Sequence, residues 1–177
     1  MELHATVGPS QTSISAVAAH AGVRRSTVYR HFPDEAALVE ACGAHWIAAN
    51  PPPDISGWVA VDPPDERVHL ALDELYSFYG RTERMLDNLL RDETLVPAIE
   101  EGFASFRGYL ASAADTLMLG RTLRGTARRQ TRAALGHAVA FSTWKSLVRE
   151  QGRSPAQAVA LMRALVTATS TVTDRRA

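Results

Sequence analysis

The sequence predicts an all-α protein with a small N-terminal helix-turn-helix unit followed by a larger helical body. Apolar residues recur at intervals of three and four over most of the chain, as in amphipathic helices. Alternating, strand-like runs are short, and the only β-like piece is GWVAV at residues 57–61. The chain has 177 residues, of which 46% are apolar and 21% are charged, so it is long enough to bury a core.

Capping and breaking residues bound each of the predicted N-terminal helices. Ser13 and Asp34 can accept hydrogen bonds from the first turn of a following helix. Gly22 suits the left-handed position that ends a helix, and Pro33 disfavours helical dihedral angles in the residue before it. These helices are expected at about 14–20, 25–31 and 35–49.

A proline-rich segment separates the N-terminal helices from the rest of the chain. Residues 50–64 contain five prolines, which predicts a linker or stiff loop. We therefore divide the chain into an N-terminal unit at 1–49, this linker, and a helical body at 65–177.

Longer amphipathic helices are predicted in the body. Apolar residues from Ile99 to Leu117 step by four and three, which is the spacing of one helix face. Gly120 and Gly125 bracket a turn, and Ser154 opens a final helix with proline in its first turn. The predicted body helices lie at about 65–80, around 85–90, and at about 94–119, 126–150 and 155–172.

The stretch AHAGVRRSTVYRHFPDEAAL, residues 19–38, concentrates hydrogen-bond donors between two apolar segments. Two short helices joined by a glycine turn form a helix-turn-helix, whose second helix enters the DNA major groove. No acidic residue occurs between Glu2 and Asp34, so this region is basic although the net charge of the chain is zero. On spacing alone, a surface helical hairpin with solvated charges is the alternative.

The segment GPSQTSISAVAAHAGVRRSTVYRHFPDEAAL resembles the DNA-binding region of the TetR family of bacterial transcriptional repressors. The resemblance implies a homodimeric, sequence-specific regulator that binds a double-stranded DNA operator, with a helical body that binds a small effector. The segment GHAVAFSTWKSLVREQGRSPAQAV also resembles the penultimate-helix region of one subgroup of this family. The residues that carry the main resemblance are Gly8, Thr12, Ser13, Ile14, Val17, Ala18, Ala21, Gly22, Val23, Thr27, Val28, Tyr29, His31, Phe32 and Leu38.

The resemblance also implies which side chains contact DNA. Tyr29 and His31, with Thr12 or Ser13, are expected to contact backbone phosphates. Arginine and hydroxyl side chains of the second helix are the candidates for base edges or nearby phosphates. The full set of predicted DNA contacts is Thr12, Ser13, Arg24, Arg25, Ser26, Thr27, Tyr29, Arg30 and His31.

Three positions depart from the family pattern. Arg24 stands where a serine-like cap is usual, so the second helix either lacks a side-chain cap or is capped later by Ser26. Glu35 stands where a phosphate-binding lysine is common, which predicts weaker phosphate affinity. Only MELHATV precedes Gly8, so we expect a shortened first helix.

In the body, the same resemblance implies a hydrophobic effector pocket and a dimer interface. Alanines at 156, 160, 164 and 168 lie on one face of the final helix and allow close approach of a partner helix, within the chain or from a second copy. For each aromatic residue, an ordinary place in the core is the alternative. The predicted pocket residues are Tyr76, Tyr79, Met85, Phe103, Phe106, Tyr109, His137, Phe141 and Trp144.

Other function classes receive little support. We expect no enzyme activity, no cofactor and no metal site, because catalytic and phosphate-loop motifs are missing and the six histidines are scattered. The single Cys42 excludes an internal disulfide, and no apolar segment is long enough to span a bilayer, so a cytoplasmic protein is expected. A helical dimeric interaction or ligand-binding module without DNA binding is the alternative function.

Overall fold

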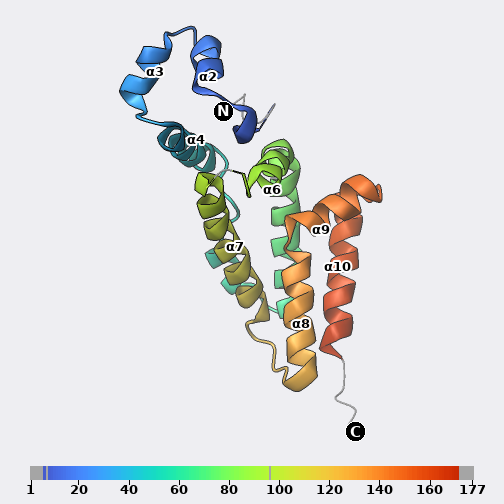
Figure 1. Ribbon diagram of the computed structural model, residues 1–177. Helices are drawn as coiled ribbons and strands as arrows, with labels where there is room; N and C mark the ends of the chain where they lie inside the picture. Colours follow the sequence, from blue (N-terminus) through green and yellow to red (C-terminus); the bar gives the residue numbers. More distant parts are fainter. Residues whose placement is uncertain (1–5, 7, 96, 172–177) are drawn as a thin grey trace. The chain divides into compact units, whose positions relative to one another are not determined.

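The computed structural model describes residue 6 and residues 8–95 and 97–171, and every regular element among them is helical (Figure 1). The all-α prediction is therefore confirmed. The predicted shortened helix before Gly8 lies outside the described residues, except for residue 6. In chain order the helices are η1 (Pro9–Gln11), α2 (Ile14–His20), α3 (Arg25–His31), α4 (Glu35–Ala49), α5 (Ile55–Val59), α6 (Pro64–Asp92), α7 (Pro97–Met118), α8 (Gly125–Ala138), α9 (Phe141–Lys145), η2 (Ser146–Glu150) and α10 (Pro155–Ser170).

The chain forms two compact units, each built from two stretches of sequence. Residues 1–51 and 82–106 form the first, which we call the head unit, and residues 52–81 and 107–177 form the second, the body unit. Helices α6 and α7 each contribute residues to both units. The division at residues 49 and 64 that the sequence suggests stays a prediction.

The head helices begin and end at the predicted residues. The Ser13 hydroxyl oxygen accepts the Ala16 N–H at 3.1 Å, and an Asp34 carboxylate oxygen accepts the Ala37 N–H at 2.8 Å. Gly22 has a φ of 66°, a left-handed conformation that ends α2 without side-chain strain. Arg24 precedes α3 without a side-chain cap, so the first of the two alternatives at this position is correct.

The prediction that residues 50–64 form only a linker or stiff loop is wrong for Ile55–Val59, which form the short helix α5. The Asp54 carboxylate caps the helix by accepting both the backbone N–H and the hydroxyl of Ser56. Trp58 is buried, and its indole N–H donates to the Glu74 carboxylate on α6 at 2.7 Å. This tertiary contact holds a segment whose local sequence alternates like a strand.

Helix α6 is continuous where the sequence suggested one helix near 65–80 and a second near 85–90. Gly80 lies within it and disfavours helix by about 1 kcal/mol relative to alanine. The buried stripe nevertheless continues past this glycine at spacings of three and four, so burial of one helix face outweighs the glycine. The stripe consists of Val68, Leu72, Leu75, Tyr79, Thr82 and Leu86.

The helix expected at about 126–150 is interrupted at Val139 and Ala140, and its last turn, η2, is π-helical. The hydroxyls of Tyr76 and Tyr79 donate to the carbonyls of Ala138 and Val139. In a continuous helix these two carbonyls would accept hydrogen bonds from backbone N–H groups of the next turn. Here they accept from side chains of α6 instead, which stabilises the break between α8 and α9.

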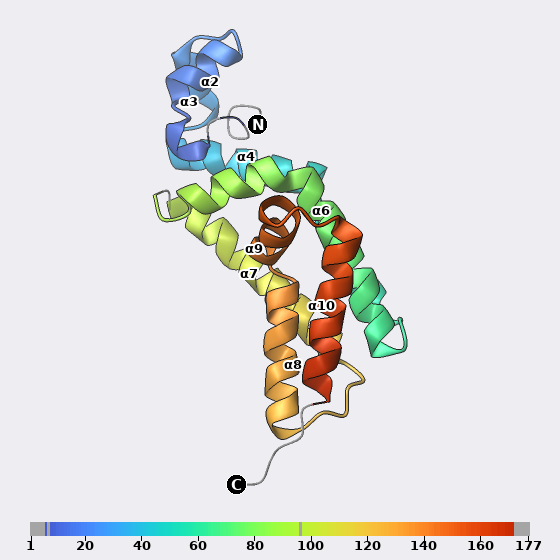
Figure 2. The same ribbon diagram turned by 90° about the vertical axis from the view of Figure 1, so that its right-hand side faces the viewer.

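Helices α8 and α10 lie side by side within the body unit (Figures 1 and 2). Ser154 and Gln157 form a reciprocal capping box at the start of α10, with Pro155 in its first turn as predicted. Among the described helices, none is both long and apolar enough to cross a membrane.

Candidate nucleic-acid interface

Helices α2 and α3 pack against each other and leave one side of α3 uncovered. The contact between them is apolar, with Ile14, Ala18 and Val28 buried beside Leu38 of α4. Thr27 is half-buried, whereas the other polar residues predicted to contact DNA from α3 and its cap are exposed. The exposed set is Arg24, Arg25, Ser26, Tyr29, Arg30 and His31.

Arg25 and Tyr29 form a pair on the exposed side of α3. The Arg25 Nη2 donates to the Tyr29 hydroxyl at 2.9 Å, and the guanidinium carbon lies 5.3 Å from the centre of the tyrosine ring. Residues four apart on a helix are neighbours, so this spacing could have predicted the pair. The contact restricts the guanidinium while leaving its other N–H groups available to a base or phosphate.

Thr12 and Ser13 both have local partners. The Thr12 hydroxyl donates to the Gly8 carbonyl at 2.7 Å, so its proton is used within the head. The Ser13 oxygen accepts from the backbone of α2, and its own O–H remains able to donate to a phosphate. Of these two residues, Ser13 therefore has the chemistry for a phosphate contact.

The charged side chains on the exposed surface of α2 and α3 are all basic. Between residues 8 and 33 the chain carries Arg24, Arg25 and Arg30 and no carboxylate side chain. Asp34 and Glu35 follow at the start of α4, where negative charge is favourable for the helix. A local basic surface of this kind attracts the phosphate backbone although the whole chain is neutral.

Comparison with known proteins agrees with this geometry. Residues 1–42 match the family described as bacterial regulatory proteins, tetR family. The N-terminal segment of the chain is thus that of a TetR family regulator. The TetR family is a family of DNA-binding transcription regulators, and the matched segment contains α2, α3 and the exposed basic surface. Searches among curated proteins and among solved structures gave no match.

Four residues of the predicted effector pocket lie together in the body unit of the regulator. The ring of Tyr79 lies 5.4 Å from that of Phe141 and 6.1 Å from that of Trp144, and Tyr76 lies 6.3 Å from Tyr79. Burial raises the pKa of the hydroxyls of Tyr76 and Tyr79. The side chains of Tyr76, Tyr79, Phe141 and Trp144 pack closely together, and we call them the aromatic cluster.

Trp144 differs from the other members of the aromatic cluster. Its side chain is 1% exposed, yet its indole N–H has no hydrogen-bond partner among the described residues. Phe141 stacks on the indole at 5.4 Å and the Arg149 guanidinium lies 5.2 Å from its centre. A buried donor without an acceptor is unfavourable by about 1–3 kcal/mol.

The remaining predicted pocket residues are distributed over both units. Tyr109 belongs to the body unit, and its hydroxyl donates to the Pro53 carbonyl at 2.9 Å. Met85, Phe103 and Phe106 belong to the head unit, where the rings of the two phenylalanines meet edge to face at 6.1 Å. The structure thus brings part of the predicted set together in each unit.

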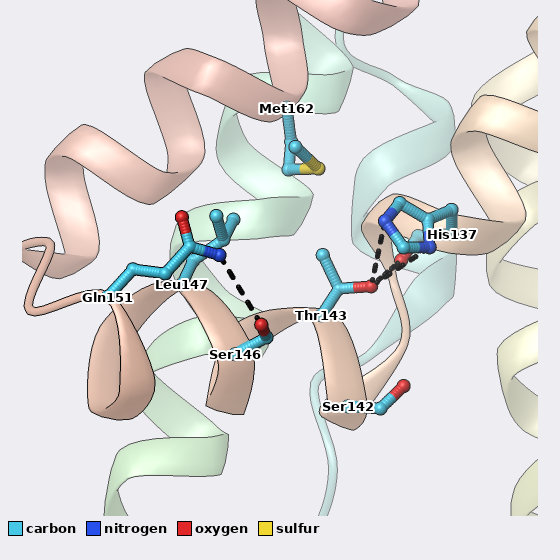
Figure 3. Close-up of a pocket in the computed structure, with 7 residues that line it drawn as sticks. All are labelled: His137, Ser142, Thr143, Ser146, Leu147, Gln151 and Met162. Atoms are coloured by element: carbon cyan, nitrogen blue, oxygen red, sulfur yellow. Dashed lines mark hydrogen bonds between the residues drawn. The ribbon is translucent and has the colours of Figure 1, made fainter.

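His137 lines a pocket of about 250 Å³ (Figure 3). The Thr143 hydroxyl lies beside the His137 ring and donates to the His137 carbonyl at 2.6 Å. The pocket is formed by the end of α8, by α9 and η2, and by α10. Its other lining residues, which the sequence did not indicate, are Ser142, Ser146, Leu147, Gln151 and Met162.

Metal-binding side chains are not grouped in this structure. Among residues 6, 8–95 and 97–171, no three histidine, cysteine or carboxylate side chains lie together in a way that could hold a metal ion.

Proposed function

We propose that this regulator is a transcriptional repressor that binds its operator as a homodimer and releases it when a small hydrophobic effector binds the body. The single observation that supports DNA recognition is the exposed basic side of α3. Helix α3 packs on α2 through the apolar contact of Ile14, Ala18 and Val28. Guanidinium groups bind guanine edges and phosphates, and an arginine-bearing helix after a glycine turn presents them to the major groove.

Selection from a random DNA duplex library, followed by mobility shift, tests DNA recognition. We expect the protein to enrich one duplex with two related half-sites and to bind it less tightly as salt rises. Arg25→Ala is expected to weaken this binding, whereas Arg153→Ala, at an exposed arginine outside the head unit, is the matched control. Failure to enrich any duplex would favour the alternative of an interaction or ligand-binding module without DNA binding.

The dimer interface is proposed on α8 and α10. The helix proposed to read the DNA bases, α3, is short and makes few contacts by itself. Two-fold pairing of two copies places their two reading helices about one helical turn of DNA apart. Leu161 and Leu165 of α10 are exposed, and the exposed alanines at 160, 164 and 168 continue the same helix. An exposed apolar helix of this kind is suited to a second copy of the chain.

The aromatic cluster is the proposed effector region. Its rings are largely apolar, and the unsatisfied indole N–H of Trp144 can donate to a carbonyl or ether oxygen of a neutral ligand. An effector weakens DNA binding only if it binds the released state better, and about 1.4 kcal/mol of difference changes operator affinity tenfold.

Screening by thermal shift, followed by mobility shift with each stabilising compound, tests this region. Trp144→Phe keeps an aromatic ring and removes the donor, so we expect it to weaken effector binding while operator binding without effector is kept. Equal effector affinity in the variant and the parent would contradict the assignment. We further propose that the protein acts in the cytoplasm and without catalysis, as a regulator of transcription.

A further inference from the structure

Asp92, the last residue of α6, is hydrogen-bonded to Ser10, near the start of the head unit. Its side chain is 1% exposed, and one carboxylate oxygen accepts the backbone N–H of Ser10 at 3.0 Å. The other oxygen accepts the Arg91 Nε–H at 2.8 Å. Ser10 lies in η1, shortly before α2, so the carboxylate joins the end of α6 to the segment that leads into the DNA-binding helices.

Gly8 fits closely against the same two side chains. It is buried with a φ of 92°, and a Cβ placed on it would overlap the Arg91 guanidinium and lie 2.5 Å from Asp92 Oδ2. The Thr12 hydroxyl closes this turn on the Gly8 carbonyl. The turn at residues 8–12 therefore has both a specific hydrogen bond and a steric fit to the end of α6.

The position of Asp92 in its helix is unfavourable by itself. A carboxylate at a helix C-terminus faces the negative end of the helix dipole, and its burial removes hydration. The Arg91 guanidinium and the Ser10 N–H offset these terms at the site. The hydrogen bond from Ser10 therefore joins this carboxylate to the segment before α2.

We propose that Asp92 is a positioning residue for DNA recognition: it fixes how α2 and α3 are held on the end of α6, and thereby the spacing of the two reading helices in the dimer. The inference rests on the proposed function as a dimeric DNA-binding regulator. Loosening this contact leaves the base-reading side chains unchanged but widens the range of positions that each reading helix adopts.

The test compares the duplex selected by the parent protein with two versions lengthened or shortened by a single base pair between the half-sites. We expect Asp92→Ala to bind the selected duplex on the order of tenfold more weakly and to discriminate less against both altered spacings. Asp92→Asn keeps an oxygen acceptor for Ser10 and is expected to lie between the parent and Asp92→Ala. The matched control is Asp73→Ala, at an exposed aspartate of the same helix.

Parental affinity and parental spacing discrimination in a helical, dimeric Asp92→Ala protein would overturn the proposal. If Asp92→Ala loses helicity by circular dichroism, unchanged spacing discrimination in the isosteric Asp92→Asn protein is the overturning result. Amide hydrogen exchange of Ser10 gives a readout that needs no DNA. If the parent selects no duplex, the proposed function fails, whereas an equally protected Ser10 amide in the parent and in Asp92→Ala would overturn the anchoring itself.

Discussion

The hydrogen bond between Arg25 and Tyr29 predicts that their contributions to operator binding are coupled. Arg25→Ala is expected to weaken operator binding by about 1–3 kcal/mol if the guanidinium holds a guanine edge. Tyr29→Phe removes the hydroxyl that accepts from Arg25 but keeps the ring, so part of the same effect is expected. The two substitutions should be less than additive in a double-mutant cycle measured by mobility shift. Full additivity would show that the pair does not orient the guanidinium on DNA.

Arg67 is expected to be a major determinant of stability in the body unit. It is buried, and its guanidinium donates to the carbonyls of Trp58, Val59 and Leu119, at the ends of α5 and α7. Arg67→Met leaves these carbonyls without their donor and should lower the free energy of unfolding by roughly 2–5 kcal/mol. Denaturant unfolding measures this change.

Arg163→Met is the matched control for Arg67. The Arg163 side chain forms a partly exposed ion pair with Glu66 at 3.0 Å, and such pairs contribute less than about 1 kcal/mol. A loss of stability in Arg67→Met no greater than that in Arg163→Met would contradict the role of the buried guanidinium.

At the level of residues, local contacts could be predicted from the sequence and distant ones could not. The caps formed by Ser13 and Asp34 involve partners three residues away, and the structure confirms both. The Asp92 contact joins residues 82 positions apart, and no periodicity or motif signals it. The basic side of α3 was recognisable because one short segment supplies all of it.

The same distinction holds for whole elements. The bounds of α2, α3 and α4 were predictable because capping residues and glycine or proline set them locally. Helix α5 depends on the contact of Trp58 with α6, and the break before α9 depends on two tyrosine hydroxyls. These features follow from tertiary contacts, which a single sequence read by periodicity does not reveal.

The break between α8 and α9 leads to a prediction about alkaline pH. Burial raises the pKa of Tyr76 and Tyr79, whose hydroxyls bind carbonyls at the break. In the unfolded chain both phenols ionise near pH 10, whereas in the folded protein they keep their protons. Their contribution to stability is therefore complete below about pH 10 and is lost as pH rises further, by up to about 1.4 kcal/mol per pH unit for each phenol.

Denaturant unfolding at pH 8 and at pH 11 measures this loss. Tyr76→Phe combined with Tyr79→Phe removes both ionising groups, so the variant should be less stable at pH 8 and should lose less stability between the two pH values. An equal loss in the variant and the parent would contradict the assignment to these tyrosines.

At the scale of the whole molecule, neutral net charge means that DNA affinity has to come from a local basic surface, and the proposed homodimer would use that surface twice. Each copy offers one basic α3, and binding of the second half-site becomes intramolecular once two copies are joined, which raises affinity by about 10²–10⁴-fold. Operator binding is therefore expected to depend on side chains of α10 that do not themselves contact DNA.

Charge introduced on α10 tests this dependence. Leu161 and Leu165 are 48% and 38% exposed, so Leu161→Glu combined with Leu165→Glu should leave each copy folded while placing carboxylates opposite one another across the two-fold axis. We expect a monomeric mass by light scattering at micromolar concentration and a large loss of operator affinity. Leu90→Glu, at a 40% exposed position in the head unit, is the control and should remain dimeric. A dimeric mass in the double variant would place the interface elsewhere, whereas a monomer with parental affinity would show that one copy suffices to bind the operator.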